Sequence, residues 1–266
     1  MIVTTSDKPS TAALEKAKRL AEELGGRYVR RGRYTLRQLA DQHSEERLIA
    51  VTEKEVRFYE GQTEQPLFFH PSMAFVRVKR LRKGDSDPLI ELSGCREGDI
   101  VVDCTAGLGS DSLVFSYAAG ETGHVTALES EPVLAAIVRE GLADYRTGLP
   151  DVDAAMRRIE LRTRHHGDYL KELPDNSVDI VYFDPMFRQP IHESSALQPL
   201  RELANPEALS EQAVADAVRA ARKAVILKEH RDSGEFARLG FERRHVNTSK
   251  IAYGVIEVAT TASASE

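Results

Sequence analysis

From residue 100 onward, short apolar runs alternate with segments of helical spacing, and this alternation constrains the fold more than any other feature. The runs of strand length are 100–104, 124–128, 159–164, 178–183, 224–228, 241–246 and 251–258. Between the fourth and fifth runs, apolar residues recur at helical spacing at Ala213, Val214, Ala217, Val218 and Ala221. Strands that alternate with helices form parallel sheets covered on both faces. The sequence therefore predicts an α/β fold around a mostly parallel sheet.

The first run leads into a turn of small residues at Asp103–Gly109 and then into a helix that we expect to begin near Ser112. Glycine allows a ligand to approach the backbone closely, and a helix N-terminus presents unpaired N–H groups to an anion. The turn therefore indicates a site for a nucleotide-like cofactor.

Acidic residues follow the next two strands. Glu129 ends the second strand, 22 residues after Gly107, where a carboxylate can accept hydrogen bonds from both ribose hydroxyls. We expect the third strand to end in His166-Gly167-Asp168, where Asp168 can accept a hydrogen bond from an adenine amine. Dinucleotide sites also pair a glycine turn with an acid, but the third glycine of their motif falls at Ser112. The residues favour a nucleotide cofactor other than a dinucleotide.

The fourth strand ends in Asp184-Pro185-Met186-Phe187. This tetrapeptide resembles the Asn/Asp-Pro-Pro-aromatic motif of amine-methylating class I S-adenosylmethionine-dependent methyltransferases, with Met186 in place of the second proline. The RsmJ-type methyltransferases of small-subunit ribosomal RNA share that replacement. They are also similar at Asp103–Gly109, Ser195-Ala196-Leu197, Arg201 and the strand 225–228. The resemblance covers roughly residues 95–258.

This resemblance implies a Rossmann-like methyltransferase fold with a mostly parallel seven-stranded sheet, and S-adenosyl-L-methionine as the cofactor. The residues implied to bind the cofactor are Asp103, Thr105, Gly107, Gly109, Asp111, Glu129 and Asp168. Those implied to be catalytic are Asp184, Pro185 and Phe187. The implied substrate is an exocyclic guanine amine of ribosomal RNA, contacted by Arg188, Ser195, Arg201 and Lys228.

The chemistry expected of the tetrapeptide follows from the acceptor. A guanine amine is a poor nucleophile because its lone pair is delocalised into the ring. The Asp184 carboxylate and the Pro185 carbonyl can accept its two hydrogens and orient the nitrogen. Phe187 can stack on the base. A base inside a helix cannot reach such a pocket, so we expect a single-stranded, unstacked or flipped nucleotide.

The first part of the chain predicts a separate, smaller α/β module. A helix is expected from the apolar stripe Ala13, Ala17, Leu20, Ala21 and Leu24, and a second one from the capping-box pattern Thr35–Gln38. Leu48–Val51 and Val56–Tyr59 predict a strand pair. The expected organisation is a module at 1–65, a packed linker at 66–90, a methyltransferase domain at 91–258 and a disordered tail at 259–266.

Charge is distributed unevenly between these parts. The whole chain carries a net charge of -6, but residues 1–83 contain 17 Lys and Arg against 11 Asp and Glu. One basic cluster, Arg27, Arg30, Arg31, Arg33 and Arg37, is interleaved with Tyr28 and Tyr34; the other comprises Arg77, Lys79, Arg80, Arg82 and Lys83. Arginines among tyrosines offer both phosphate neutralisation and stacking. We therefore expect Arg30, Arg31 and Arg33 to contact RNA.

Composition excludes several other classes of protein. With 41% apolar and 29% charged residues, the 266-residue chain is typical of globular proteins and not of disordered, collagenous or coiled-coil ones. It contains no apolar run of the roughly 20 residues that a membrane span needs, and its first residues lack the order of a signal peptide. We expect a cytoplasmic protein without a membrane partner. The sequence does not indicate an oligomeric state.

The cysteines and histidines do not predict a metal site. Cys95 and Cys104 have no partners at metal-binding spacing, and we interpret both as buried thiols. His165 and His166 lack a third ligand at a recognisable spacing. As neighbours on a strand they would also point to opposite faces. We expect no bound metal.

Two other functions remain compatible with the sequence. The same cofactor can serve methylation of a protein side chain, including an isoaspartate carboxylate, or of a small molecule. An anionic Asp184 would repel a carboxylate acceptor. The chain can also be a non-catalytic RNA-binding or assembly protein with a relic cofactor fold, although the presence of Glu129, Asp168 and Asp184 argues against this.

Overall fold

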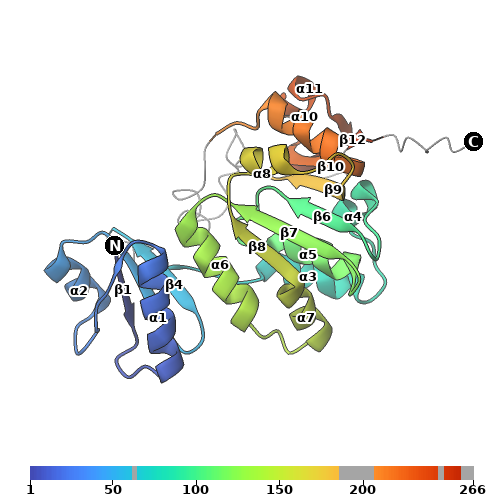
Figure 1. Cartoon of the computed structure of the whole chain (residues 1–266). Helices are drawn as coiled ribbons and strands as arrows, with labels where there is room; N and C mark the ends of the chain where they lie inside the picture. The colour runs from blue at the N-terminus through green and yellow to red at the C-terminus, as the bar shows by residue number, and fades with distance from the viewer. Residues whose placement is uncertain (62–64, 186–206, 245–248, 259–266) are drawn as a thin grey trace, which may run out of the picture.

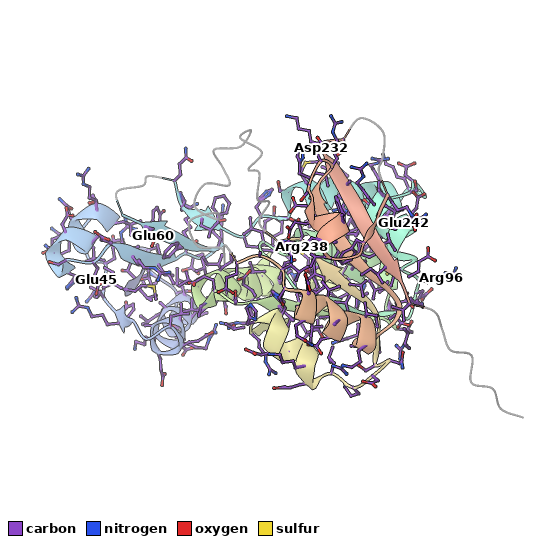
Figure 2. All side chains as sticks on the ribbon, turned by 90° about the horizontal axis from the view of Figure 1, so that it is seen from above. Glu45, Glu60, Arg96, Asp232, Arg238 and Glu242 are labelled. Atoms are coloured by element: carbon purple, nitrogen blue, oxygen red, sulfur yellow. The ribbon has the colours of Figure 1, made fainter. Side chains whose placement is uncertain are left out.

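A computed structural model describes residues 1–61, 65–185, 207–244 and 249–258. The chain forms two β-sheets, each with its own helices, which lie side by side (Figure 1). Seen from above in Figure 2, Glu45 and Glu60 lie on the part with the smaller sheet, and Arg96, Arg238 and Glu242 lie on the part with the larger one. We call these sheets the N-terminal sheet and the large sheet.

The large sheet has seven strands in the order β11-β12-β10-β9-β6-β7-β8. Five are parallel neighbours, and β12 pairs antiparallel with both β10 and β11. The strands are β6 (Ile100–Asp103), β7 (His124–Glu129), β8 (Ile159–Thr163), β9 (Val178–Phe183), β10 (Ala221–His230), β11 (Glu242–Arg244) and β12 (Ile251–Glu257). The predicted α/β fold with a mostly parallel seven-stranded sheet is confirmed.

Helices cover both faces of the large sheet. On one face, Val181 and Leu227 pack with Ala217 of the crossover helix α10 (Glu211–Ala220). On the other, Val101 and Ile180 belong to a second cluster with residues of α4 and α5. Together with α10, the described helices around this sheet are α3 (Ser72–Leu81), α4 (Pro88–Ser93), α5 (Ser110–Ala119), α6 (Pro132–Asp144), α7 (Pro150–Arg158), α8 (His166–Glu172) and α11 (Glu235–Arg238). Among the described residues, no helix is both long and apolar enough to span a bilayer.

The order of the strands determines where a ligand can bind. β6 comes first along the chain of this sheet, yet it lies between β7 and β9. The connections that leave β6 and β9 at their carboxyl ends therefore diverge, and parallel α/β sheets bind their ligands at such a switch point. The turn after Asp103 and the segment after Phe183 both begin there.

The N-terminal sheet has the order β2-β1-β3-β4-β5. Its strands are β1 (Ile2–Thr5), β2 (Arg27–Tyr28), β3 (Arg47–Val51), β4 (Val56–Glu60) and β5 (Leu67–Phe68), and its helices are α1 (Thr11–Glu23) and α2 (Leu36–His43). The predicted antiparallel pair is present as β3 and β4. The capping box is present too, because Gln38 N donates to Thr35 Oγ1 over 3.1 Å and Thr35 N donates to Gln38 Oε1 over 2.9 Å.

Residues 66–90, expected as a packed linker, contain three elements. β5 pairs with β4 and completes the N-terminal sheet. α3 packs against α5, and α4 packs near β10 and β12. We propose that the division between the two parts falls just after β5.

Both cysteines are buried free thiols, as predicted. Burial raises the pKa of Cys95 to about 12 and raises that of Cys104 well above its usual value. Neither thiol is therefore a ready nucleophile at neutral pH.

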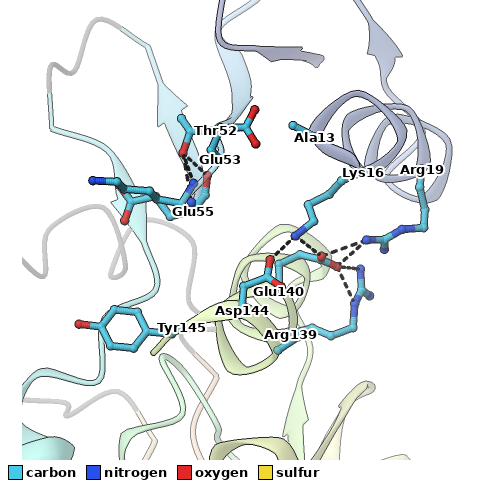
Figure 3. Close-up of polar contacts among 12 residues, drawn as sticks. Ala13, Lys16, Arg19, Thr52, Glu53, Glu55, Arg139, Glu140, Asp144 and Tyr145 are labelled. Atoms are coloured by element: carbon cyan, nitrogen blue, oxygen red, sulfur yellow. Dashed lines mark hydrogen bonds and ion pairs between the residues drawn. The ribbon is translucent and has the colours of Figure 1, made fainter. Parts of the chain in front are cut away.

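The N-terminal sheet and its helices dock along α6 through a buried carboxylate (Figure 3). Glu140 of α6 accepts hydrogen bonds from Arg19 of α1 at 2.9 and 3.0 Å and from the neighbouring Arg139, and Lys16 lies 3.3 Å away. Burial opposes the charge of Glu140, but these cations outweigh it and hold its pKa below the usual value. Arg47 of β3 contacts Glu131, the N-cap of α6, over 3.2 Å.

A glycine on α6 lets an aromatic ring pack directly against that helix. A Cβ at Gly141 would lie 2.1 Å from Cγ of Phe69, so no larger residue fits beside that ring. Phe69 also meets Tyr145 edge to face, with ring centroids 5.9 Å apart. The bare backbone of Gly141 therefore lets the segment after β5 pack on α6.

We expect Gly141→Ala to lower the free energy of unfolding by about 1–3 kcal/mol, because the added methyl group overpacks the contact with Phe69. Helix propensity alone predicts the opposite sign, a gain of about 1 kcal/mol. Urea unfolding measures the difference. Gly234→Ala is the matched control, since a Cβ there meets nothing within 4 Å. Equal or higher stability of Gly141→Ala would show that the interface is looser than described.

Candidate active site

The turn between β6 and α5 leaves backbone groups open to a ligand. Gly107 and Gly109 have φ angles of 51° and 73°, a region that side chains disfavour. Gly109 is the N-cap of α5, and none of the described side chains caps that helix. The first turn of α5 thus presents N–H groups without a side-chain acceptor, as anion-binding helix termini do.

Asp103, at the end of β6, holds this turn from within the protein. Its Oδ1 accepts from Thr105 N over 3.1 Å, and its Oδ2 accepts from the Ser112 hydroxyl over 2.5 Å. Burial raises the pKa of Asp103 to about 7, although the hydrogen bonds from Ser112 and Thr105 oppose the shift. Asp103 therefore shapes the start of the helix, which begins at Ser110 and not near Ser112.

Glu129 ends β7 and faces the same turn. It accepts from Gly107 N over 3.2 Å and from Glu131 N over 2.9 Å, and it is buried. Burial raises its pKa, against the backbone hydrogen bonds. Each carboxylate oxygen uses one lone pair in these bonds and retains another, so a diol can still donate to both.

Asp184, directly after β9, is joined to the turn and to β10. Its backbone N–H donates to the Thr105 hydroxyl over 2.6 Å. Its Oδ2 accepts from Lys228 Nζ over 2.7 Å, and its side chain is 24% exposed. Thr105 was predicted on the cofactor side, and here its hydroxyl connects the ends of β6 and β9. The structure thus brings Thr105, Asp184 and Lys228 together.

Asp111, in the first turn of α5, is the other acceptor of Lys228. Its Oδ2 accepts from Lys228 Nζ over 2.9 Å and from the Tyr182 hydroxyl over 2.7 Å, and its Oδ1 accepts from Arg77 Nη1. Lys228 therefore bridges Asp111 and Asp184, and its side chain is only 17% exposed.

Mutual charge determines how these groups ionise. Burial opposes the charge of Asp111, but Lys228 and Arg77 outweigh it and lower the pKa of Asp111. Burial is also the main cause that raises the pKa of Asp184, and Asp111 adds to the rise while Lys228 opposes it. Burial likewise opposes the charge on Lys228, yet the two carboxylates hold its pKa above the usual range. The ammonium stays charged between two acids that share it.

The region of Asp168 differs from the prediction. β8 ends at Thr163, and Asp168 lies exposed in the first turn of α8 instead of at a strand end. His165 is the N-cap of α8, because its side chain accepts from Gly167 N. The prediction that His165 and His166 point to opposite faces was also wrong, since their ring centroids are 4.3 Å apart.

His166 lies next to the end of β9. Its ring meets Phe183 edge to face with centroids 5.7 Å apart. Burial, and then the neighbouring His165, lower the pKa of His166 to about 4, so its ring is neutral at neutral pH. Within the part of the chain that the structure describes, no group of three or more His, Cys, Asp or Glu side chains is arranged to hold a metal ion.

Several predicted residues are not placed with this site. Pro185 follows Asp184 and is described, but Met186, Phe187, Arg188, Ser195 and Arg201 lie outside the described residues. Arg30, Arg31 and Arg33 follow β2 at the carboxyl end of the N-terminal sheet, whereas Arg47 meets Glu131 from its amino end. The structure therefore separates the three arginines from Asp184.

The sequence did not indicate the partners of the network. Arg77 was grouped with a basic cluster, but it is bound to Asp111 and, through two hydrogen bonds, to Asp87. Arg82 of that cluster pairs with Asp151. The usable signal for Asp87 was its place before Pro88, since an acid before a proline is typical of a helix N-cap.

The family of the chain follows from a sequence comparison. The family described as "Putative SAM-dependent methyltransferase" matches residues 32–244, which is most of the chain. The chain belongs to this family.

Individual relatives differ in how much they share with the chain. "Uncharacterized protein YpiP" of Bacillus subtilis (strain 168) is 40% identical over 258 residues, which cover 97% of this chain and all of that protein. "Ribosomal RNA small subunit methyltransferase J" of Thioalkalivibrio sulfidiphilus (strain HL-EbGR7) is 36% identical, and that of Acinetobacter baumannii (strain SDF) is 30% identical. The chain matches only 43% of the length of each of these two methyltransferases.

A solved structure shares the fold over nearly the whole chain. It is described as the SAM-dependent methyltransferase NGO1261 from Neisseria gonorrhoeae. The TM-score is 0.64 with 18% identity, and the match covers 97% of this chain and 96% of that one. The likeness confirms the Rossmann-like methyltransferase fold.

The chain is a methyltransferase whose cofactor is S-adenosyl-L-methionine, and the geometry fits this molecule. Glu129 is buried beside the turn and retains lone pairs that could accept from ribose hydroxyls. The uncapped start of α5 offers backbone N–H groups to the carboxylate of the cofactor. We propose that Gly107, Gly109 and Glu129 hold the cofactor, with Asp103 and Thr105 fixing the turn. Contacts from Asp111 and Asp168 remain predictions.

We expect Glu129→Gln to weaken S-adenosyl-L-methionine binding by about 1–3 kcal/mol, because the amide loses one acceptor for the ribose hydroxyls. Isothermal titration calorimetry measures the affinity. The exposed Glu121→Gln is the control. Unchanged affinity in a folded Glu129→Gln chain would remove Glu129 from the cofactor site.

Proposed function

We propose that this methyltransferase transfers a methyl group to an exocyclic amine of RNA, and specifically to a guanine of small-subunit ribosomal RNA. The observation that carries the proposal is the Asp184 carboxylate at the switch point of the sheet, where it is held by Lys228 and where the Asp184 backbone N–H donates to the Thr105 hydroxyl. The names of the two partly matching relatives, both small-subunit ribosomal RNA methyltransferases, support the choice of ribosomal RNA.

Asp184 is suited to accept hydrogens from an amine. Lys228 binds its Oδ2, and the side chain is still 24% exposed, so the carboxylate can accept a further hydrogen bond. The carbonyl of Pro185 is the second acceptor that the sequence places beside it. Two acceptors in the plane of an amino group hold its nitrogen in one orientation, and alignment of this kind contributes several of the roughly 7–11 kcal/mol available from proximity.

The bound cofactor supplies a methyl group that is already activated on a sulfonium sulfur. The remaining task of the protein is to orient the acceptor nitrogen and to receive its proton. The Asp184 carboxylate can accept a hydrogen bond from the amine and can then receive its proton. The Lys228 ammonium favours the ionised form of Asp184 that both tasks need. Lys228 was predicted to bind the substrate, and the structure supports an indirect role through Asp184.

We propose further substrate contacts in the segment after Pro185. Phe187 stacks on the base, and Arg188, Ser195 and Arg201 bind the phosphates or the nucleotide, as the resemblance implies. We expect Arg30, Arg31 and Arg33 to bind RNA that flanks the target nucleotide. They would not contact the target nucleotide itself, because they lie at the other end of the N-terminal sheet from its contact with Glu131. A ribosomal substrate places the protein in the cytoplasm, where ribosomes are.

The acceptor class is tested by incubation with labelled S-adenosyl-L-methionine and separated RNA, protein and metabolite fractions. We expect the label in RNA, and we expect Asp184→Asn to lower the rate by at least about 100-fold while cofactor affinity stays within a few fold. Label in the protein or metabolite fraction would contradict the RNA substrate and identify that fraction as the acceptor. No transfer to any fraction would favour a non-catalytic RNA-binding protein.

Neutralising Arg30, Arg31 and Arg33 to Gln should flatten the dependence of RNA affinity on salt, by about one unit of slope for each phosphate that is no longer neutralised. The rate constant at saturating RNA should not change, since these residues are distant from Asp184. Filter binding across a salt series measures the slope, and Arg96→Gln on the other part of the chain is the control. An unchanged slope would show that the cluster is only a solvated surface.

A further inference from the structure

Arg77 connects a helix outside the large sheet to the catalytic edge of that sheet. It lies on α3, and its Nε and Nη2 donate to the two oxygens of Asp87 over 2.7 and 2.8 Å. Its Nη1 donates to Asp111. The guanidinium is thus saturated by two carboxylates, and the side chain is 20% exposed.

α3 runs alongside α5 in the same direction. Arg77 of α3 meets Asp111 in the first turn of α5, and five residues later Arg82 shares Asp151 with Tyr117, which lies near the end of α5. Asp87 is the N-cap of α4, so Arg77 also joins α3 to α4. One side chain therefore ties α3, α4 and α5 together beside the site.

Carboxyl groups outnumber cations around Asp184. Asp111, Asp103 and Asp184 approach from α5, β6 and the end of β9, and Lys228 of β10 is the only ammonium that an ion pair places on them within the described residues. The other titratable groups described here are Asp87 before α4, which pairs with Arg77, and the hydroxyls of Tyr182 on β9 and Tyr253 on β12. Arg77 is the second cation of this cluster.

We propose that Arg77 is a positioning residue for methyl transfer: by holding Asp111, it leaves Lys228 shared with Asp184, whose carboxylate then faces the substrate amine. This inference rests on the proposed function for the identity of the substrate. Without the guanidinium, Asp111 remains buried, and among the described side chains Lys228 and Tyr182 are its remaining hydrogen-bond donors. The Lys228 ammonium then neutralises the charge of Asp111 more strongly and that of Asp184 less. The pKa of Asp184 rises as a result, because a buried carboxylate that loses a cation becomes harder to ionise.

A double-mutant cycle tests this coupling without any RNA. Urea unfolding is measured for the wild-type chain, Arg77→Met, Asp184→Asn and the double variant. We expect Asp184→Asn to be less destabilising when Arg77 is already absent, so that the unfolding constant of the double variant departs about tenfold from additivity. Arg77→Lys provides a second cycle if Arg77→Met does not fold. Arg82→Met, just beyond the same helix, should be additive with Asp184→Asn.

The kinetic arm separates positioning from folding. With RNA that accepts the methyl group, we expect Arg77→Met to lower kcat about tenfold or more, with KM for RNA within about threefold. Removing a positive charge raises the pKa of nearby carboxylates, and transfer needs ionised Asp184, so the acidic limb of the pH–rate profile should move to higher pH. Arg77→Lys keeps the positive charge but not the two parallel hydrogen bonds of the guanidinium, so its acidic limb should shift less than that of Arg77→Met.

The two arms keep this inference separate from the proposed function. The positioning role of Arg77 would be overturned if the unfolding free energies of the two substitutions were additive. It would also be overturned if Arg77→Met lowered kcat without moving the acidic limb of the pH–rate profile. A non-additive cycle with no methylated RNA would support the coupling and contradict the RNA substrate instead.

Discussion

The site depends on one shared cation. Lys228 contacts Asp111 and Asp184 at once, and in doing so it joins β10, the start of α5 and the end of β9. A buried ammonium between two carboxylates is stable only while each charge keeps its partners, because an unpaired buried charge costs several kcal/mol. The hydrogen bonds of Tyr182 and Arg77 to Asp111 meet this condition. The network therefore fixes the Asp184 carboxylate where the strand connections diverge.

Local patterns in the sequence predicted much of this arrangement. The apolar runs identified the strands of the large sheet, because buried parallel strands require continuous apolar residues. The positive φ angles of Gly107 and Gly109 and the buried carboxylate of Glu129 are also local features, and they lie at the turn that we propose to hold the cofactor. Thr35 and Gln38 gave the capping box for the same reason.

Long-range pairing could not be predicted in the same way. The partners of Arg77 lie 10 and 34 residues further along the chain, so the sequence shows a basic cluster where the structure has an ion-pair network. Asp168 was expected at a strand end, yet β8 ends at Thr163 and the His165 side chain caps α8 there. The docking of the N-terminal sheet on α6 depends on Glu140 and Gly141, and neither has a recognisable motif.

We propose that Asp184 orients an exocyclic nitrogen of an RNA base. Small ribosomal subunits incubated with the enzyme and S-adenosyl-L-methionine can be digested to nucleosides and analysed by mass spectrometry against synthetic standards. We expect one product with the methyl group on the exocyclic nitrogen of guanine. A methyl group on a ribose oxygen or on a ring carbon would contradict it, because neither acceptor has amine hydrogens for the carboxylate to receive.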